Sequence, residues 1–225
     1  MISAASRGVA AVERALSVLG AFRAADEALA LAEIARRTGL YKSTALRLLG
    51  SLERFGYVRR LESGRYAVGP EPARLARLYQ QSFRVGDVVV PVLRELAGAS
   101  GETASYYVRE GGSRVCLHRV EPARAVRVAL YEGDRLPLEK GASGKVLRAF
   151  GARPDPALAA VRARMHATSF GERDPGAAAV ACPVFGTMQE LKGALALAGP
   201  RERFGAKRVG ELTRLVREAA ARVTA

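Results

Sequence analysis

The stretch that decides the fold is residues 29–66, which read LALAEIARRTGLYKSTALRLLGSLERFGYVRRLESGRY. Apolar residues recur at helical spacing on both sides of Gly39, which predicts two short helices joined by a tight turn. Glycine suits the end of the first helix because a left-handed cap costs it little. Residues 57–61 and 65–68 flank a Glu-Ser-Gly turn, which is typical of a two-stranded hairpin. The stretch therefore predicts a helix-turn-helix followed by a wing.

The same stretch is strongly basic. No acidic residue lies between Glu33 and Glu53, and residues 36–65 carry eight basic and two acidic side chains. A helix-turn-helix places the start of its second helix in the major groove of DNA, where Arg47 can donate two hydrogen bonds to guanine. The alternative is a helical hairpin whose charged face only meets water. We favour DNA binding, and the predicted DNA-binding residues are Arg36, Lys42, Ser43, Thr44, Arg47, Arg59 and Arg65.

Composition agrees with a polyanionic partner. The 225 residues carry a net charge of +14 and are 49% hydrophobic, which is ordinary for a globular protein. Two cysteines are too few for a disulfide scaffold. No signal peptide is evident, and the longest uncharged run, residues 175–189, is short for a membrane span. We expect a cytoplasmic protein with no membrane partner.

The rest of the chain predicts a mixed helix and sheet domain. Helices are expected at 8–24, 71–83, 87–99, 143–150 and 206–223, and Pro91 is expected in the first turn of the third of these. Strands are expected at 103–109, 114–120, 126–131, 178–185 and 191–198. The predicted class is α+β. The predicted domains are 8–68 for DNA binding, 69–85 for a linker helix, and 86–225 for a second globular domain.

Motifs in both halves resemble the IclR family of bacterial transcription regulators. The first half matches over LAEIARRTGLYKSTALRLLGSLERFGYV, and the second over LEKGASGKVLRAF, GERDPGAAAVACPVFG and GALALAGPRERF. The resemblance implies a winged helix-turn-helix, a linker helix, and a GAF-like (PAS/profilin-like) effector-binding domain. It also implies a repressor or activator that binds double-stranded operator DNA as a homodimer or dimer of dimers. Its effector would be a small organic molecule, either an organic acid or an aromatic compound.

The resemblance also places an effector site around the GASGK segment and two later strands. A helix start attracts carboxylates through its unpaired N–H groups and its dipole. The expected effector-binding residues are Gly141, Ala142, Ser143, Gly144, Ser169, Ala179, Cys182, Ala196 and Ala198. Alanine stands at three positions where relatives often carry polar residues, so the expected effector is larger or more hydrophobic than a very small acid. The connection between Phe150 and Gly176 is shorter than in the family, and Met165-His166 replaces its usual Gly-Tyr pair.

Two other classes of function are weighed against this one. Residues 141–145 lack the glycine spacing of a phosphate-binding loop and of a nucleophile elbow. The candidate catalytic residues Cys182, His118 and His166 show no spacing that brings them together, so we predict no enzyme, catalytic residue or cofactor. The alternative function is a metal- or redox-responsive regulator that uses Cys116, His118 and Cys182. Cys116 and His118 are two apart on a strand and would share a face, and with Cys182 or His166 they could form a metal site. The paired ligand spacings of zinc sites are absent, so no metal is predicted.

Overall fold

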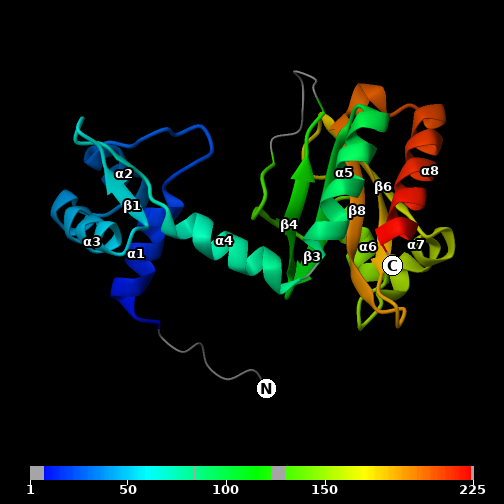
Figure 1. Cartoon of the computed structure of the whole chain (residues 1–225), viewed down its shortest axis with the longest axis horizontal. Helices are drawn as coiled ribbons and strands as arrows, with labels where there is room; N and C mark the ends of the chain where they lie inside the picture. Colours follow the sequence, from blue (N-terminus) through cyan, green and yellow to red (C-terminus); the bar gives the residue numbers. More distant parts are fainter. Residues whose placement is uncertain (1–7, 84, 123–129, 224–225) are drawn as a thin grey trace. The chain divides into compact units, whose positions relative to one another are not determined.

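The structure is a computed structural model and describes residues 8–83, 85–122 and 130–223 (Figure 1). The chain divides between Tyr79 and Gln80 into two compact units. Each unit has its own hydrophobic core, and each is described separately below.

The first unit is a three-helix head with a small hairpin. It contains α1 (Ala10–Gly20), α2 (Leu31–Thr38), α3 (Lys42–Arg54), β1 (Val58–Arg60) and β2 (Tyr66–Val68). The strands are antiparallel and pair Val58 with Val68. Gly39 ends α2 with a φ of 68°, the left-handed geometry that the sequence predicts. Val18, Ile34 and Leu49 are fully buried between the three helices, so the predicted winged helix-turn-helix is confirmed.

The linking helix α4 (Glu71–Ser82) spans the boundary between the units. Its first turn is tied to the head, because the Glu71 N–H donates to the Gly56 carbonyl at 3.0 Å. Within the described residues, no side chain of α4 is buried. The helix is therefore stabilised by its connections at both ends and by local ion pairs such as Arg74 with Glu71, rather than by packing in a core.

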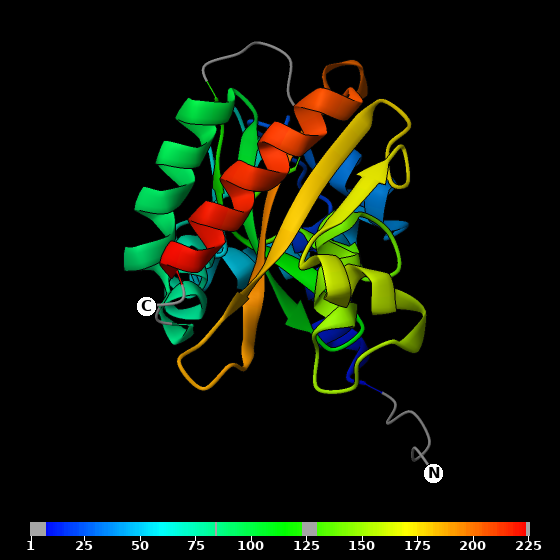
Figure 2. The same ribbon diagram turned by 90° about the vertical axis from the view of Figure 1, so that its right-hand side faces the viewer.

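The second unit is built on a six-stranded antiparallel sheet with the order β5-β4-β3-β8-β7-β6. The strands are β3 (Thr103–Glu110), β4 (Ser113–Val120), β5 (Arg135–Pro137), β6 (Ala167–Phe170), β7 (Ala177–Phe185) and β8 (Leu191–Pro200). The α-helices are α5 (Gly86–Ser100), α6 (Ala142–Ala149), α7 (Ala159–Arg164) and α8 (Ala206–Val223), with short 3-10 turns at Pro156–Leu158 and Arg201–Arg203. Helices α5 and α8 lie side by side on one face of the sheet, and α6 lies on the other (Figure 2).

The two faces of the sheet hold two separate cores. Under α5 and α8, large side chains such as Leu93, Leu195 and Leu212 pack together. Under α6, larger side chains such as Leu147 are mixed with small residues of the sheet such as Ala181 and Ala194. Small side chains on one face of a sheet leave room between the sheet and its covering helix. That face is where the cavity described below lies.

The mixed α+β class is confirmed, but several details differ from the prediction. Pro91 lies inside α5 and not in its first turn, because the helix begins at Gly86. Of the strand expected at 126–131, residues 126–129 lie outside the described residues, and Leu130 and Tyr131 are not in a strand. The sheet continues instead through β5, and the shortened 150–176 connection still forms α7 and the edge strand β6.

Candidate nucleic-acid interface and ligand cavity

Helix α3 begins without a capping side chain. Tyr41 occupies the cap position in an extended conformation, and the first turn contains no acidic residue. The first internal hydrogen bond of the helix runs from the Ala45 N–H to the Tyr41 carbonyl at 2.9 Å. The N–H groups of Lys42, Ser43 and Thr44 therefore precede the helical ladder and point along the positive end of its dipole. Such an uncapped start is suited to binding a phosphate.

The predicted base-contacting residues share the solvent-facing side of α3. Lys42, Ser43 and Arg47 are exposed, whereas Ala45 and Leu49 on the opposite side are fully buried. Arg47 lines a groove of about 250 Å³ between α1 and α3, together with Arg14. Among the described residues, no hydrogen bond or ion pair holds the side chain of Lys42 or Arg47, so both charges are available to a partner. Tyr41, which was not among the predicted DNA-binding residues, is 86% exposed beside Lys42.

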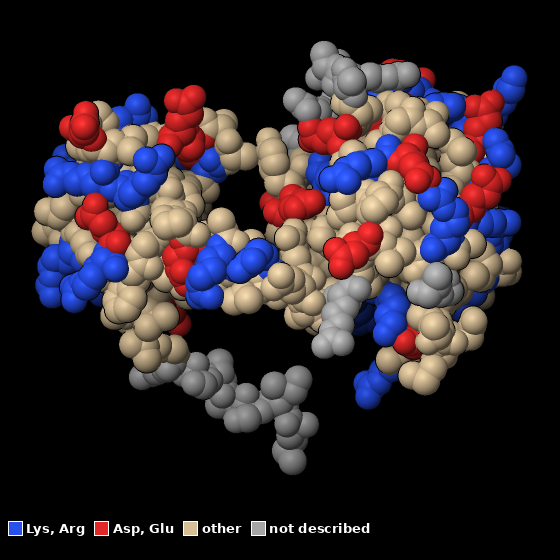
Figure 3. Space-filling model, viewed as in Figure 1, with Lys and Arg blue, Asp and Glu red and all other residues tan. Residues whose placement is uncertain are grey.

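The two arginines at the end of α2 are already paired. Arg36 donates two hydrogen bonds to Glu33 at 2.8 and 2.6 Å, and Arg37 bridges Glu33 and Asp26. The hydrogen bonds from Arg36 and then Arg37 lower the pKa of Glu33 to about 2. Arg36 is exposed, but Glu33 offsets its charge, so it is a weaker candidate for DNA than Arg47. Figure 3 shows the same mixture, with acidic side chains among the basic ones on the head.

The predicted wing arginines have different surroundings. Arg59 is exposed on β1. The Arg65 guanidinium donates to the backbone carbonyl of Ala28, which ties the wing to the segment before α2. Arg60 lies 5.8 Å from the centre of the Tyr66 ring, in a cation–π contact. Arg65 therefore has a structural partner within the head, whereas no hydrogen bond or ion pair among the described residues holds the Arg59 side chain.

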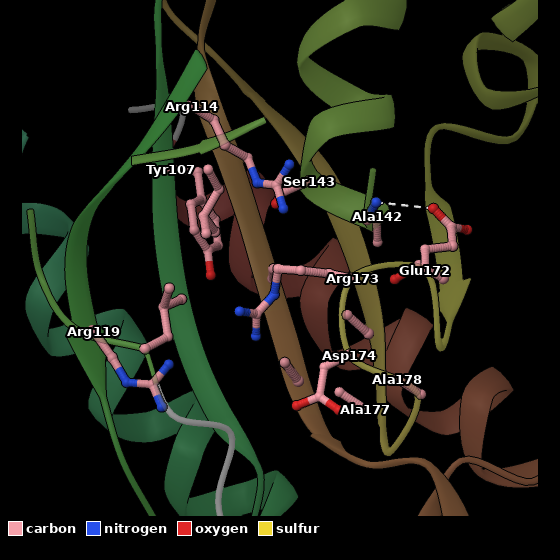
Figure 4. Close-up of a pocket in the computed structure, with 17 residues that line it drawn as sticks. Tyr107, Arg114, Arg119, Ala142, Ser143, Glu172, Arg173, Asp174, Ala177 and Ala178 are labelled. Atoms are coloured by element: carbon pink, nitrogen blue, oxygen red, sulfur yellow. Dashed lines mark hydrogen bonds between the residues drawn. The ribbon is translucent and has the colours of Figure 1, made fainter. Parts of the chain in front are cut away.

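A cavity of about 60 Å³ lies between the sheet and α6 in the second unit. Arg114 and Arg119 reach it from β4, and Arg173 reaches it from the loop between β6 and β7 (Figure 4). Small residues of α6, β7 and β8 form the opposite wall. The lining residues are Tyr107, Arg114, Arg119, Leu130, Leu136, Gly141, Ala142, Ser143, Ser169, Glu172, Arg173, Asp174, Ala177, Ala178, Ala179, Ala196 and Ala198.

Three arginines and two carboxylates, Glu172 and Asp174, line the cavity, and this excess of positive charge favours an anion. The Arg114 guanidinium donates to the carbonyls of Pro137 and Lys140 and lies 5.7 Å from the Tyr107 ring centre. Burial lowers the pKa of Arg114, and the nearby positive charge of Arg173 lowers it further. In the part of the chain that the structure describes, no hydrogen bond or ion pair holds the Arg173 side chain. The positive charges of Arg114 and Arg173 repel each other in this partly buried site, and a negatively charged ligand between them would offset that repulsion.

Glu172 occupies part of the helix start that the sequence assigns to an effector. Its carboxylate accepts the Gly141 N–H at 2.9 Å and pairs with the Lys145 ammonium group. Burial acts to raise the pKa of Glu172, but these hydrogen bonds outweigh it and the pKa is lowered. The N–H at the N-cap of α6 is therefore already bound to the chain's own carboxylate. The next two backbone N–H groups of α6, those of Ala142 and Ser143, remain as donors for a ligand at this end of the helix.

Most of the expected effector-binding residues surround this one cavity, and two do not. Gly144 is packed against backbone, since an added Cβ would lie 2.3 Å from the Leu138 carbonyl oxygen. Cys182 packs in the core under α5 and α8, on the other face of the sheet, so its assignment to the cavity is wrong. Alternation along β7 explains this, because Ala179 and Ala181 face α6 while Val180 and Cys182 face away.

The cavity is more polar than the three alanines singled out from the sequence indicate. Ala179, Ala196 and Ala198 line it as expected, but the arginines of β4 and the 172–174 loop face them. The GERDPG motif contains Glu172, Arg173 and Asp174, and this was the available sequence signal for the loop. Arg114 and Arg119 had no such signal, because arginine on a predicted strand is usually solvated. The expectation of a larger or more hydrophobic effector is not supported by this lining.

The residues of the metal or redox alternative are not brought together. A β-bulge opposite Tyr106 and Tyr107 breaks the alternation of β4, so Cys116 packs under α6 whereas the His118 ring lies against Gly86 in α5. Cys182 lies in the other core. Burial raises the pKa of both thiols to about 12. Among the described residues, no group of three or more His, Cys, Asp or Glu side chains could hold a metal ion.

An uncapped, basic recognition helix on a winged head, joined to a separate mixed domain, defines a two-domain DNA-binding transcription regulator. The model of the IclR helix-turn-helix domain matches residues 11–62. The model of the C-terminal domain of the bacterial transcriptional regulator IclR matches residues 78–157 and 155–225. The chain belongs to the IclR family, whose members are transcriptional regulators and not enzymes.

Individual relatives agree over nearly the whole chain. The glycerol operon regulatory protein of Streptomyces griseus is 30% identical over 97% of this chain and 96% of its own length. The transcriptional regulator BhcR of Paracoccus denitrificans is 29% identical over 96% of this chain and 86% of its own. An IclR homologue from Microbacterium hydrocarbonoxydans, solved with 4-hydroxybenzoate, shares the fold with a TM-score of 0.79 and 21% identity, over 96% of this chain and 98% of that one. No helix among the described residues is long and apolar enough to cross a membrane.

Proposed function

We propose that this protein is a sequence-specific transcription regulator whose hold on operator DNA is controlled by a small organic anion. The observation that carries the proposal is the convergence of Arg114, Arg119 and Arg173 on one cavity in the second unit. Arginine presents a planar fork that matches a carboxylate, and a partly buried site strengthens that contact. The 4-hydroxybenzoate bound to the Microbacterium homologue is an acid of this kind, and it supports the proposed chemistry by analogy.

The volume and the lining together narrow the ligand class. A cavity of about 60 Å³ has room for a small molecule with few heavy atoms unless the surrounding loop moves. Its apolar wall is alanine, which fits a short carbon chain or the edge of one ring. We therefore propose a small carboxylate, aliphatic or aromatic, and not the larger hydrophobic effector expected from the alanines alone.

We assign residues 8–68 to operator reading, 69–85 to the link and 86–225 to ligand sensing. A homodimer is supported by an exposed apolar stripe along α1 and its cap residue, where Val9, Val12 and Leu16 are 66%, 54% and 60% exposed. These residues follow helical spacing, yet the head does not bury them. A stripe of this kind is typical of a surface covered by a second copy. Two copies would present two recognition helices to two half-sites, as operators require. The operator as partner implies the cytoplasm.

The proposed function is tested with matched pairs of acids and amides. Acetate, pyruvate, succinate, benzoate and 4-hydroxybenzoate are titrated calorimetrically into the full chain, and the corresponding neutral amides serve as controls. We expect at least one acid to bind, its amide to bind at least about tenfold more weakly, and the Arg173→Gln variant to lose that preference. Arg214→Gln is the control variant, because Arg214 pairs with Glu218 on the surface of α8. Equal binding of acid and amide would contradict the proposal.

The second measurement links the ligand to DNA. A DNA sequence selected from a random library by the full chain replaces the unknown operator. The bound acid is expected to change the affinity for that DNA by about 5- to 150-fold, the usual size of coupling between two sites. Arg173→Gln should bind the DNA normally and show no response to the acid. A ligand that binds without changing DNA affinity would leave the cavity without a regulatory role.

A further inference from the structure

The end of the linking helix is hydrogen-bonded to the strand that carries the cavity arginines. The Nε2 amide of Gln80, in the last turns of α4, donates to the Leu117 carbonyl of β4 at 3.2 Å. The same amide donates to Oε2 of Glu132 at 2.9 Å. Both partners are acceptors, so the orientation of the Gln80 amide follows from its surroundings. Phe83, just beyond the helix, packs against the core under α5. The last part of α4 is thus attached to the second unit.

The other oxygen of Glu132 is bound to a cavity residue. Oε1 of Glu132 accepts the backbone N–H of Arg119 at 2.8 Å. Arg119 lines the cavity, and two nitrogens of its guanidinium each donate to the same carboxylate oxygen of Glu121 at 3.3 Å. A single carboxylate therefore stands between a residue that faces the ligand cavity and a residue of the linking helix.

The turn at residues 131–134, which carries Glu132, is also connected to the cavity through the residue that precedes it. Leu130, two residues before Glu132, is 3% exposed and lines the cavity. The turn is fixed to β4 by backbone hydrogen bonds, from the Gly133 N–H to the Cys116 carbonyl at 2.8 Å and from the Cys116 N–H to the Asp134 carbonyl at 3.1 Å. A displacement of β4 or of Leu130 by a ligand would therefore move Glu132 with it, because a hydrogen-bonded turn does not deform independently of its strand.

We infer that Glu132 is the coupling residue through which the ligand cavity acts on the linking helix, by way of Arg119 on one side and Gln80 on the other. This inference rests on the proposed function. A carboxylate that draws the Arg119 guanidinium away from Glu121 shifts the backbone of Arg119, and the Glu132 carboxylate follows its N–H donor. Gln80 then loses or changes its contact, and the end of α4 is released or reoriented. The first turn of the same helix is bonded to the head at Gly56, so the change reaches the DNA-binding unit along the chain.

Two variants break this relay at the same bond from opposite sides. In Glu132→Gln, the side-chain oxygen can still accept the Arg119 N–H, but its amide then faces the Gln80 amide as donor against donor. In Gln80→Ala the donor is removed from the half-buried helix end. Glu218→Gln on the exposed face of α8 is the matched control. Circular dichroism and the calorimetric affinity for the tightest-binding acid of the panel establish that each variant is folded and binds ligand.

The decisive measurement is the change in DNA affinity that the acid produces. We expect both relay variants to bind the acid with an affinity within about threefold of wild type. In both variants the acid-induced change in DNA affinity should be about fivefold or more smaller than in wild type. The double variant should lose no more coupling than Gln80→Ala alone, since the bond between Gln80 and Glu132 is already absent from that variant. Hydrogen exchange near residues 78–82 should respond to the acid in the wild type and not in Glu132→Gln.

If wild type binds no acid, the proposed function fails and the relay with it. If wild type binds and responds and both relay variants respond equally, the relay alone is overturned.

Discussion

Glu172 places its carboxylate on the Gly141 N–H at 2.9 Å, where α6 begins and where an effector carboxylate was expected. The chain thus supplies its own anion to this helix start, and Lys145 holds the same carboxylate. The arrangement satisfies a backbone donor and complements the helix dipole. It leaves the three arginines, rather than the N-cap N–H of the helix, as the main attraction for a ligand.

Replacing Glu172 with Gln should weaken α6 in a pH-dependent manner. Because the pKa of Glu172 is lowered in the folded protein, its charge stabilises the fold above the ordinary carboxylate pKa, and this contribution is lost as pH falls through the folded value. Glu172→Gln should therefore cost about 0.5–1 kcal/mol at pH 7, and progressively less as pH falls below the ordinary carboxylate pKa. Thermal unfolding of both proteins from pH 3 to 8 measures the difference. Glu62→Gln, in the exposed wing turn, is the control, and a gap in unfolding temperature that does not change with pH would argue against the helix-start role.

Arg47→Ala should reduce operator discrimination by about 1–3 kcal/mol, the value of a two-hydrogen-bond contact with guanine. Arg47 is exposed on the outer side of α3, so its loss should leave the unfolding temperature of the head unchanged. Affinities for the selected DNA and for single-base variants of it give the measurement. Arg36→Ala is a useful comparison, since Glu33 already pairs with that guanidinium. Unchanged discrimination in Arg47→Ala would show that α3 lies differently in the groove.

Lys42→Ala should weaken binding to all DNA sequences by a similar factor. Lys42 stands at the start of α3, where the free N–H groups favour phosphate over bases. The slope of log affinity against log salt concentration should fall by about 1, because one phosphate contact and its released counterion are lost. Titrations between 50 and 200 mM salt, on selected and random DNA, separate this behaviour from that of Arg47→Ala. A loss confined to the selected sequence would identify Lys42 as a base-reading residue.

The head was predictable because its signals are local. Gly39 ends α2, the Glu-Ser-Gly turn joins the wing, and Ala45, Leu49 and Leu52 mark the buried side of α3 within a few residues of one another. The pairing of Arg37 with Asp26 was not predictable in the same way. It joins residues eleven positions apart across an irregular segment, and no periodic pattern records that approach. The bond from Arg65 to the Ala28 carbonyl was unpredictable for the same reason, because it depends on the folded head.

In the cavity, too, some lining residues were predictable from the sequence and others were not. The alanines of β7 and β8 and the start of α6 were expected there, since strand alternation and family motifs place them. Cys182 was misplaced because its neighbour Ala181, and not Cys182, faces α6. The β-bulge that leaves Leu117 unpaired could not be read from the sequence either, yet it decides that Cys116 and His118 separate. Long-range pairing, rather than local propensity, sets which side chains of β4 reach the ligand.

Both cysteines should be unreactive in the folded protein. Cys116 and Cys182 are 0% and 1% exposed, and burial raises both pKa values to about 12, so the thiolate is scarce at neutral pH. Alkylation by iodoacetamide at pH 8 should be slower than for an exposed thiol by on the order of 100-fold or more, and should become fast in denaturant. Intact-mass spectrometry over time measures the rates, and the denatured protein is the control. Rapid labelling of either residue in the native state, together with oxidant-sensitive DNA binding, would restore the redox-responsive alternative.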